Sequence, residues 1–244
     1  MSSKWLKSLG ILAVLAVLGQ FTLTRPADAQ GFSPGVFLPN EIVSGKTYSE
    51  WAAEWNRWFI SIPASINPSL DTTGQFCNQK QGHAAFFLAG NGTVQPAVTR
   101  SCTIPCGKPI FFPLITVECS SVENPPFLGK SPADRLTCAQ ALADLVDTSS
   151  LLTTIDGVGV TSLNRFRVAG PDTHFRMSPT DNVLGVVAAS GFTTTDGYWL
   201  MLKPLPPGSH VLHFEAALPA FTFTQDVTYD LTVKGSCSES DHQH

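Results

Sequence analysis

The hydrophobic pattern is clearest between Thr47 and Pro63, where it predicts an amphipathic α-helix. Thr47 and Glu50 have the spacing of a capping box, and Pro63 cannot continue the hydrogen bonds of a helix. We expect the apolar stripe to pack on a sheet, because such stripes are usually buried. The alternative is an aromatic platform for a sugar or another flat ligand, since indole carries a polar edge. The stripe consists of Trp51, Trp55, Trp58, Phe59 and Ile62.

A second helix is predicted from Ser131 to about Asp147. Ser131, Pro132 and Asp134 supply a cap, a proline in the first turn and an acidic residue, which together are typical of a helix start. The buried face of this helix would consist of Leu136, Ala139, Leu142, Ala143 and Val146.

The remaining pattern is that of short strands separated by turns. Residues 109–117 and 198–202 are apolar runs, and the second is expected to be a central strand covered on both faces. Residues 227–233 alternate between apolar and polar, as in a half-buried antiparallel strand. Asn91-Gly92 predicts a hairpin between residues 84–89 and 93–103, with Pro96 placing the start of the second strand at a sheet edge.

These elements predict a mainly β protein: an antiparallel β-sandwich, immunoglobulin-like or jelly-roll-like, with two peripheral α-helices. The composition agrees, because a chain with 14% charged residues, 19 glycines and 18 prolines suits a loop-rich β protein better than a helical bundle.

Residues 1–29 are predicted to be a signal peptide. Lys4 and Lys7 precede a short apolar run, and Ala27-Asp28-Ala29 offers a cleavage pattern before Gln30. The alternative is an uncleaved membrane anchor, although the run is short for a bilayer. We therefore expect one secreted or periplasmic domain over residues 30–236 and a polar tail over residues 237–244, with no membrane span after cleavage.

The charge and the cysteines are consistent with export. The net charge is −4, and the signal peptide contains more basic than acidic residues, so the mature domain is more acidic still. This argues against nucleic acid as a partner. An even number of cysteines in an exported chain predicts up to three disulfides, for which fifteen connectivities exist. The pairing that we predict is Cys77–Cys102, Cys119–Cys138 and Cys106–Cys237.

Sequence motifs give no direct indication of chemistry. The chain contains no nucleophile elbow, zinc-protease, P-loop, dinucleotide-binding or EF-hand motif, so no metal and no cofactor is predicted. His210 and His213 are three residues apart, which places them on opposite faces of a strand. They are therefore not expected to share a metal ion.

Candidate binding residues are therefore chosen by residue type and position. Arg100 is expected to be either exposed or buried beside a carboxylate, and the second case would mark a polar pocket. Glu118 and Glu123 flank a predicted loop and could supply the two carboxylates that glycoside hydrolysis requires. The candidate binding residues are Trp51, Glu54, Trp55, Arg100, Glu118 and Asp196.

Several segments resemble a family of secreted bacterial proteins of uncharacterised function. They include the tryptophan-rich helix with the residues after it (48–68), FCNQKQG (76–82), TRSCTIPCGKPIFFP (99–113) and DGYWLMLKPLPPGSHVLHF (196–214). The turn at residues 206–208 and the strand VTYDLTV (227–233) also resemble the closing hairpin of immunoglobulin-like sandwiches. The resemblance implies a fold and carries no catalytic residue with it.

The leading hypothesis is an exported, disulfide-stabilised protein that binds a glycan or an envelope component without enzymatic activity. The alternative is an extracellular polysaccharide hydrolase that uses Glu118 and Glu123 near Trp51, Trp55 and Arg100. A third possibility is a structural role through pairing of an edge strand with a partner. The deciding observation is whether Arg100, Glu54, Glu118 and Asp196 converge on one concave surface.

Overall fold

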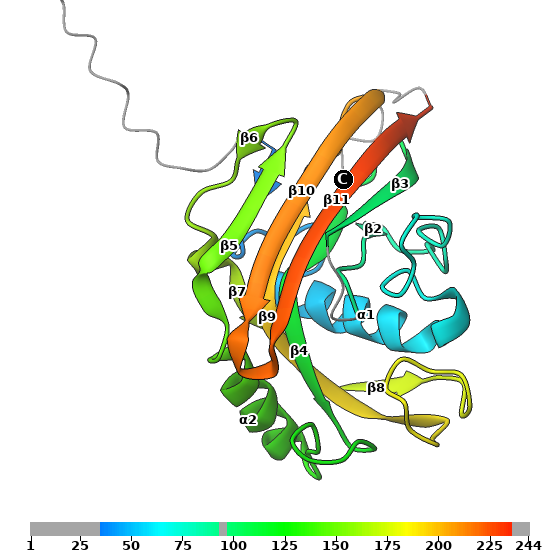
Figure 1. Cartoon of the computed structure of the whole chain (residues 1–244), viewed down its shortest axis with the longest axis vertical. Helices are drawn as coiled ribbons and strands as arrows, with labels where there is room; N and C mark the ends of the chain where they lie inside the picture. Colours follow the sequence, from blue (N-terminus) through cyan, green and yellow to red (C-terminus); the bar gives the residue numbers. More distant parts are fainter. Residues whose placement is uncertain (1–34, 93–96, 236–244) are drawn as a thin grey trace, which may run out of the picture. The chain divides into compact units, whose positions relative to one another are not determined.

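A six-stranded sheet is centred on β9 (Ser190–Leu202) in the computed structural model, which describes residues 35–92 and 97–235 (Figure 1). All of these residues belong to the unit that begins at Gly31. Along one side, β9 pairs with β4 (Ile110–Ser120), which pairs with β2 (Phe86–Phe87). On its other side, β9 pairs in turn with β1 (Val36–Phe37), β7 (Arg167–Ala169) and β8 (Thr173–Arg176).

A second, five-stranded sheet has the strand order β3-β11-β10-β5-β6. These strands are β3 (Val98–Pro105), β11 (Phe223–Lys234), β10 (Gly208–Leu218), β5 (Asp147–Ile155) and β6 (Val158–Gly159). The helices are α1 (Tyr48–Ser61), α2 (Pro132–Ala143) and the short 3-10 turns η1 (Ala64–Ile66), η2 (Leu163–Phe166) and η3 (Pro219–Phe221). Neither α-helix in this part of the chain is long and apolar enough to cross a membrane.

The six-stranded sheet lies between α1 and the second sheet. Phe111 stacks on Trp199 at 5.3 Å on the α1 side, whereas Phe112 contacts Phe214 of the second sheet at 4.9 Å. Figure 1 shows β10 and β11 in front of β9 and β4. Residues 198–202 are buried on both faces, which confirms the predicted central strand. The predicted mainly β sandwich with two helices is therefore observed.

The tryptophans of α1 are core residues. Thr47 and Glu50 form the predicted capping box, and the helix ends before Pro63. Trp51, Trp55 and Trp58 are at most 3% exposed. Their indole N–H groups donate to the carbonyls of Val43, Leu88 and Gln79 at 3.0, 2.8 and 2.8 Å. Because both the faces and the polar edges of the indoles are occupied, the stripe packs on the sheet and does not form an exposed platform.

The predicted hairpin at Asn91-Gly92 is wrong. β2 pairs with β4 in the first sheet, whereas β3 pairs with β11 in the second, and both pairs are parallel. The local turn signal is overridden because Phe86 and Phe87 are buried against β4 and α1. Residues 93–96 lie outside the described residues. β3 is an edge strand, as Pro96 indicated.

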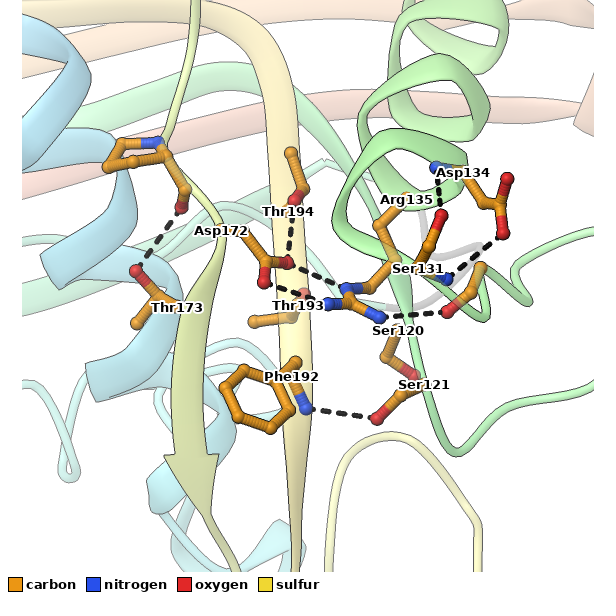
Figure 2. Close-up of polar contacts among 12 residues, drawn as sticks. Ser120, Ser121, Ser131, Asp134, Arg135, Asp172, Thr173, Phe192, Thr193 and Thr194 are labelled. Carbon is orange, nitrogen blue, oxygen red and sulfur yellow. Dashed lines mark hydrogen bonds and ion pairs between the residues drawn. The ribbon is translucent and has the colours of Figure 1, made fainter.

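The predicted buried face of α2 is confirmed at Ala139, Leu142 and Ala143, and Val146 after the helix is also buried, but Leu136 differs. The helix ends at Ala143, because β5 begins at Asp147, and Leu136 is 37% exposed. Arg135 is buried instead and forms a two-pronged ion pair with Asp172 at 2.6 and 2.7 Å (Figure 2). Arg135 also donates to the carbonyl of Gly129, and Thr194 of β9 donates to Asp172. This network fixes α2 to the six-stranded sheet.

Two of the predicted disulfides are present. Cys77–Cys102 joins the segment after α1 to β3, and Cys119–Cys138 joins β4 to α2. Each closes a loop of moderate length and is expected to contribute about 3 kcal/mol. Cys106 is also disulfide-bonded. Its predicted partner, Cys237, lies outside the described residues, as do the predicted signal peptide and the polar tail.

The Arg135–Asp172 pair should make stability depend on acid pH. The hydrogen bond from Arg135 lowers the pKa of Asp172, so its stabilisation is present above the unfolded value of about 3.9 and is lost as the pH falls through the folded value. We expect Asp172→Asn to cost about 3 kcal/mol at pH 7 and to lose less stability on acidification than the wild type. Urea unfolding at pH 7 and pH 3 measures both effects. The exposed Asp230→Asn is the control, and equal stability of the two variants at pH 7 would contradict this account.

Candidate functional site

A β-bulge in β4 decides which way Glu118 points. Pro113 pairs with Trp199 and Ile115 with Tyr198, so Leu114 is an extra residue in the strand. After an insertion of one residue, the side-chain alternation is reversed. Without the bulge Glu118 would share the face of Phe112, which points toward the second sheet. With it, Glu118 pairs with Thr195 and faces α1.

Gln225 of β11 holds this bulge from the second sheet. Its amide nitrogen donates to the carbonyl of Leu114, and its amide oxygen accepts from the backbone N–H of Asn91 at 2.9 Å. Gln225 is only 4% exposed. One buried side chain therefore connects the bulge, β11 and the segment around Asn91.

A cavity of about 350 Å³ lies beside the bulge, between α1, β4 and the turn that joins β10 to β11. The volume is in the range of sites that bind small molecules. Glu118 and Glu123 both line it, together with Asn56 and Asn91. Its aromatic side chains are Trp55, Phe59, Phe127, Phe221 and Phe223.

Glu118 and Glu123 form a hydrogen-bonded carboxyl pair. Burial raises the pKa of Glu118 well above its ordinary value, and the hydrogen bond to Glu123 and its negative charge raise it further. Glu118 therefore keeps its proton to a higher pH than an ordinary glutamic acid does. Thr193 donates to Glu118 at 2.6 Å, and Ser120 donates to Glu123 at 2.8 Å.

The carboxyl pair is connected to α1. The amide of Asn56 donates to the hydroxyl of Thr193 at 3.1 Å, and this hydroxyl donates to Glu118. Asn56 and Thr193 are 2% and 1% exposed, respectively. The position of Glu118 is therefore fixed from both the sheet and the helix, as a preorganised binding site requires.

Asn91 lines the cavity and has a buried hydrogen-bond donor without a partner in the described part of the chain. It is 6% exposed, and its side-chain amide nitrogen has no hydrogen-bond partner among the residues described. A buried polar atom without a partner costs free energy. A ligand with an acceptor at this point would satisfy it.

Arg100 shapes the wall of the cavity from outside it. It is 1% exposed and forms no ion pair within residues 35–92 and 97–235, so the predicted buried carboxylate partner is not observed. Its five hydrogen bonds instead go to the hydroxyl of Tyr229 and to the backbone carbonyls of Ser69, Asp71, Ala89 and Gly90. Ser69 and Gly90 line the cavity. Arg100 thus positions two wall segments and does not itself face a ligand.

Only some of the predicted site residues lie at the cavity. Trp55 and Glu118 line it, whereas Trp51 is fully buried against the sheet. Glu54 pairs with Lys46 at 2.6 Å, and Asp196 pairs with Arg167 at 2.8 Å on the face of β9 that packs on α2. Asn91 and Gln225, which line the cavity, and Thr193, which donates to Glu118, were not predicted as site residues, because only tertiary contacts bring them there.

One group on the strands could hold a metal ion. His213, Glu215 and Asp226 each offer a ligand atom, and these atoms lie within 4.8 Å of one another on β10 and β11. His213 contacts Asp226 at 3.1 Å and Glu215 at 3.3 Å, so an ion pair accounts for the same geometry. His210 bonds Asp156 instead, at 2.7 Å, and does not join this group.

Replacing Arg100 should loosen the cavity wall and the fold together. Arg100→Met leaves several buried carbonyls without a donor, and we expect a loss of about 3 kcal/mol or more. Urea unfolding with intact disulfides, followed by tryptophan fluorescence, measures the loss. Exposed Arg165→Met is the matched control and should change stability by less than about 0.5 kcal/mol. If Arg100→Met does not fold, Arg100→Lys should fold with intermediate stability. An Arg100→Met variant as stable as the control would show that the wall segments hold without it.

The Glu118 proton should make the fold less stable at higher pH. The pKa of Glu118 is raised in the folded state. The contribution of its proton to the free energy of unfolding is therefore complete below the unfolded pKa of about 4.3 and is lost as the pH rises through the folded pKa. Glu118→Gln keeps a neutral donor in place and should therefore lose less stability between pH 5 and pH 8 than the wild type. The more exposed Glu215→Gln should keep the wild-type slope. Identical slopes for all three proteins would mean that Glu118 titrates normally.

No protein-family model and no curated protein matches this chain. Two solved structures show weak similarity. One is the cysteine protease inhibitor EhICP2 from Entamoeba histolytica, with 14% identity, coverage of 55% of this chain and 86% of that chain, and a TM-score of 0.19. The other is amebosin, with 12% identity, coverage of 57% of this chain and 100% of that chain, and a TM-score of 0.18. Similarities this weak carry no argument about fold or function.

Proposed function

We propose that this chain is an exported, disulfide-stabilised binding protein whose cavity takes a small organic cation with an apolar body. The observation that carries the proposal is that Glu118 and Glu123 both line an aromatic-walled cavity of about 350 Å³. Export is supported by the disulfides, which are typical of oxidising compartments, and by the signal-peptide pattern of residues 1–29.

The charge of the pair favours a cation. Two carboxyls that hold a single proton carry one negative charge, and among the described residues no lysine or arginine lines the cavity to neutralise it. A cation at this position would form charge-assisted hydrogen bonds with the carboxyl oxygens. Burial strengthens such contacts, because the surroundings screen charge less than water does.

The aromatic walls support the same class of ligand. Phe127 and Phe221 lie 5.7 Å apart at the cavity, and Phe59 stacks on Trp55 at 5.2 Å. Aromatic faces attract cations and also bury apolar groups. The free amide of Asn91 adds a donor for an acceptor atom of the ligand. The ligand class is therefore an amine with an aromatic or aliphatic body.

The alternative of polysaccharide hydrolysis is less well supported by this geometry. Retaining glycosidases hold their carboxyls about 5–5.5 Å apart and inverting enzymes about 6.5–9.5 Å apart. Glu118 and Glu123 are in direct hydrogen-bond contact, which is closer than either arrangement. Arg100 and Trp51, which the hydrolase hypothesis also required, do not line the cavity.

Benzylamine, benzyl alcohol and benzoate test the proposal, because they share one aromatic ring but are positively charged, neutral and negatively charged, respectively. We expect benzylamine to bind about tenfold more tightly than benzyl alcohol, and benzoate to bind most weakly. Binding is measured by calorimetry and by the fluorescence of Trp55, which lines the cavity.

Variants of the carboxyl pair identify the source of this preference. Glu118→Gln leaves the charge on Glu123, whereas the double variant Glu118→Gln/Glu123→Gln removes it, so only the double variant should lose the preference for the amine. Glu215→Gln, which changes a carboxyl outside the cavity, is the control. Equal binding of benzoate and benzylamine would exclude the proposal. Release of sugars from a polysaccharide by the wild type and not by Glu118→Gln would favour the hydrolase.

A further inference from the structure

A second cavity, of about 440 Å³, lies at the carboxyl end of α1 and is lined by basic side chains. Three separate segments of the chain supply them: α1, the segment that follows Cys77, and β8. The basic residues are Arg57, Lys80, His83, His174 and Arg176. None of these residues lines the cavity that contains Glu118.

The positive charges of this cavity are only partly compensated. Its lining contains no carboxylate, although the chain as a whole has a net charge of −4. Glu54, outside the lining, lies 3.6 Å from Arg57 and 3.8 Å from His83 but pairs most closely with Lys46, at 2.6 Å. Neither Lys80 nor Arg176 takes part in a salt bridge within the described part of the chain.

The position of Lys80 is explained in part by its role as a cap at the end of α1. Its ammonium donates to the carbonyl of Ser61 at 2.7 Å and to the hydroxyl of Ser61 at 3.3 Å, at the negative end of the helix. Lys80 adopts a left-handed backbone conformation with φ of 50°, which a side chain other than glycine adopts only at a cost. Capping explains neither the two arginines nor the two histidines that lie beside it.

Gathering like charges from three segments opposes folding unless something else compensates them. We infer that this cavity binds an oxyanion of the phosphate or sulfate type, with Arg57, Arg176 and Lys80 as its main ligands. Guanidinium groups bind such anions through paired N–H donors, and a lysine adds a mobile point charge. The hydroxyl of Ser61, at the same cavity, offers a further polar contact.

His83 makes the binding dependent on pH. Burial lowers the pKa of His83; Lys46, Arg57 and Lys108 lower it further, while the charge of Glu54 opposes them. His83 is therefore neutral at pH 7 and gains a proton only in acid. The affinity for an anion should rise as the pH falls, and a bound anion should in turn raise the pKa of His83.

The experiment uses the whole protein with inorganic phosphate and inorganic sulfate, and with chloride at the same ionic strength as the control for screening. We expect both oxyanions, but not chloride, to bind saturably, and sulfate, which stays a dianion, to bind more tightly at pH 5.5 than at pH 7.5. Arg176→Gln should weaken binding about tenfold, whereas Arg165→Gln, an exposed arginine outside the cavity, should leave it unchanged. Histidine resonances followed by NMR should show the pKa of His83 rising when sulfate is added.

Two results with the wild type and the single variants would overturn the inference. One is the absence of saturable binding of phosphate and sulfate at low salt. The other is the same weakening in Arg165→Gln as in Arg176→Gln, which would indicate screening of the whole surface. A double variant, Arg57→Gln/Arg176→Gln, removes both guanidinium groups and should abolish binding; retained binding would place the anion elsewhere. Glu118→Gln/Glu123→Gln should bind sulfate normally, so failure of one site leaves the other testable.

Discussion

Arg100 lies in the interior without a carboxylate to pair with it among the described residues, and the segments around it are arranged to supply carbonyl oxygens instead. A buried cation is tolerated only when hydrogen bonds replace the water that it has lost. Here these bonds come from two irregular segments, residues 69–71 and 89–90, and from Tyr229 on the neighbouring strand. The guanidinium therefore holds these irregular segments in one conformation. In strands and helices, backbone hydrogen bonds have the same effect.

The same region is pinned to β3 in two further ways. The Cys77–Cys102 disulfide crosses from the loop to the strand two residues after Arg100, and Gly74 approaches Ser101 so closely that a Cβ atom would lie 2.2 Å from its carbonyl oxygen. The wall of the Glu118 cavity that contains Ser69 is thus held against β3 by a disulfide, by close backbone packing and by the bond from Arg100 to Ser69. The raised pKa of Glu118 depends on such contacts, because a wall that moved away would admit water and restore the ordinary pKa.

The sequence predicted those parts of the fold that depend on local pattern. The capping box of Thr47, the burial of residues 198–202 and two disulfide pairings were predicted correctly. The hairpin at Asn91 was not, because burial of Phe86 and Phe87 outweighed a favourable turn, and Arg135 took the inward position expected for Leu136. Glu118 and Trp55, which were predicted as site residues, line the candidate cavity, but the roles of Asn91, Thr193 and Gln225 depend on contacts between residues more than one hundred positions apart. No local pattern carries that information.

The extra residue at Leu114 determines which face of the sheet each later side chain of β4 occupies. Phe111 and Glu118 face the same helix although seven positions separate them, and in an unbroken strand an odd separation places two side chains on opposite faces. Deletion of a single residue between them would leave the strand partners and both sheets in place. It would nevertheless turn the side chain of Glu118 toward the second sheet. The number of residues between these two positions therefore decides whether the cavity contains the Glu118 carboxyl.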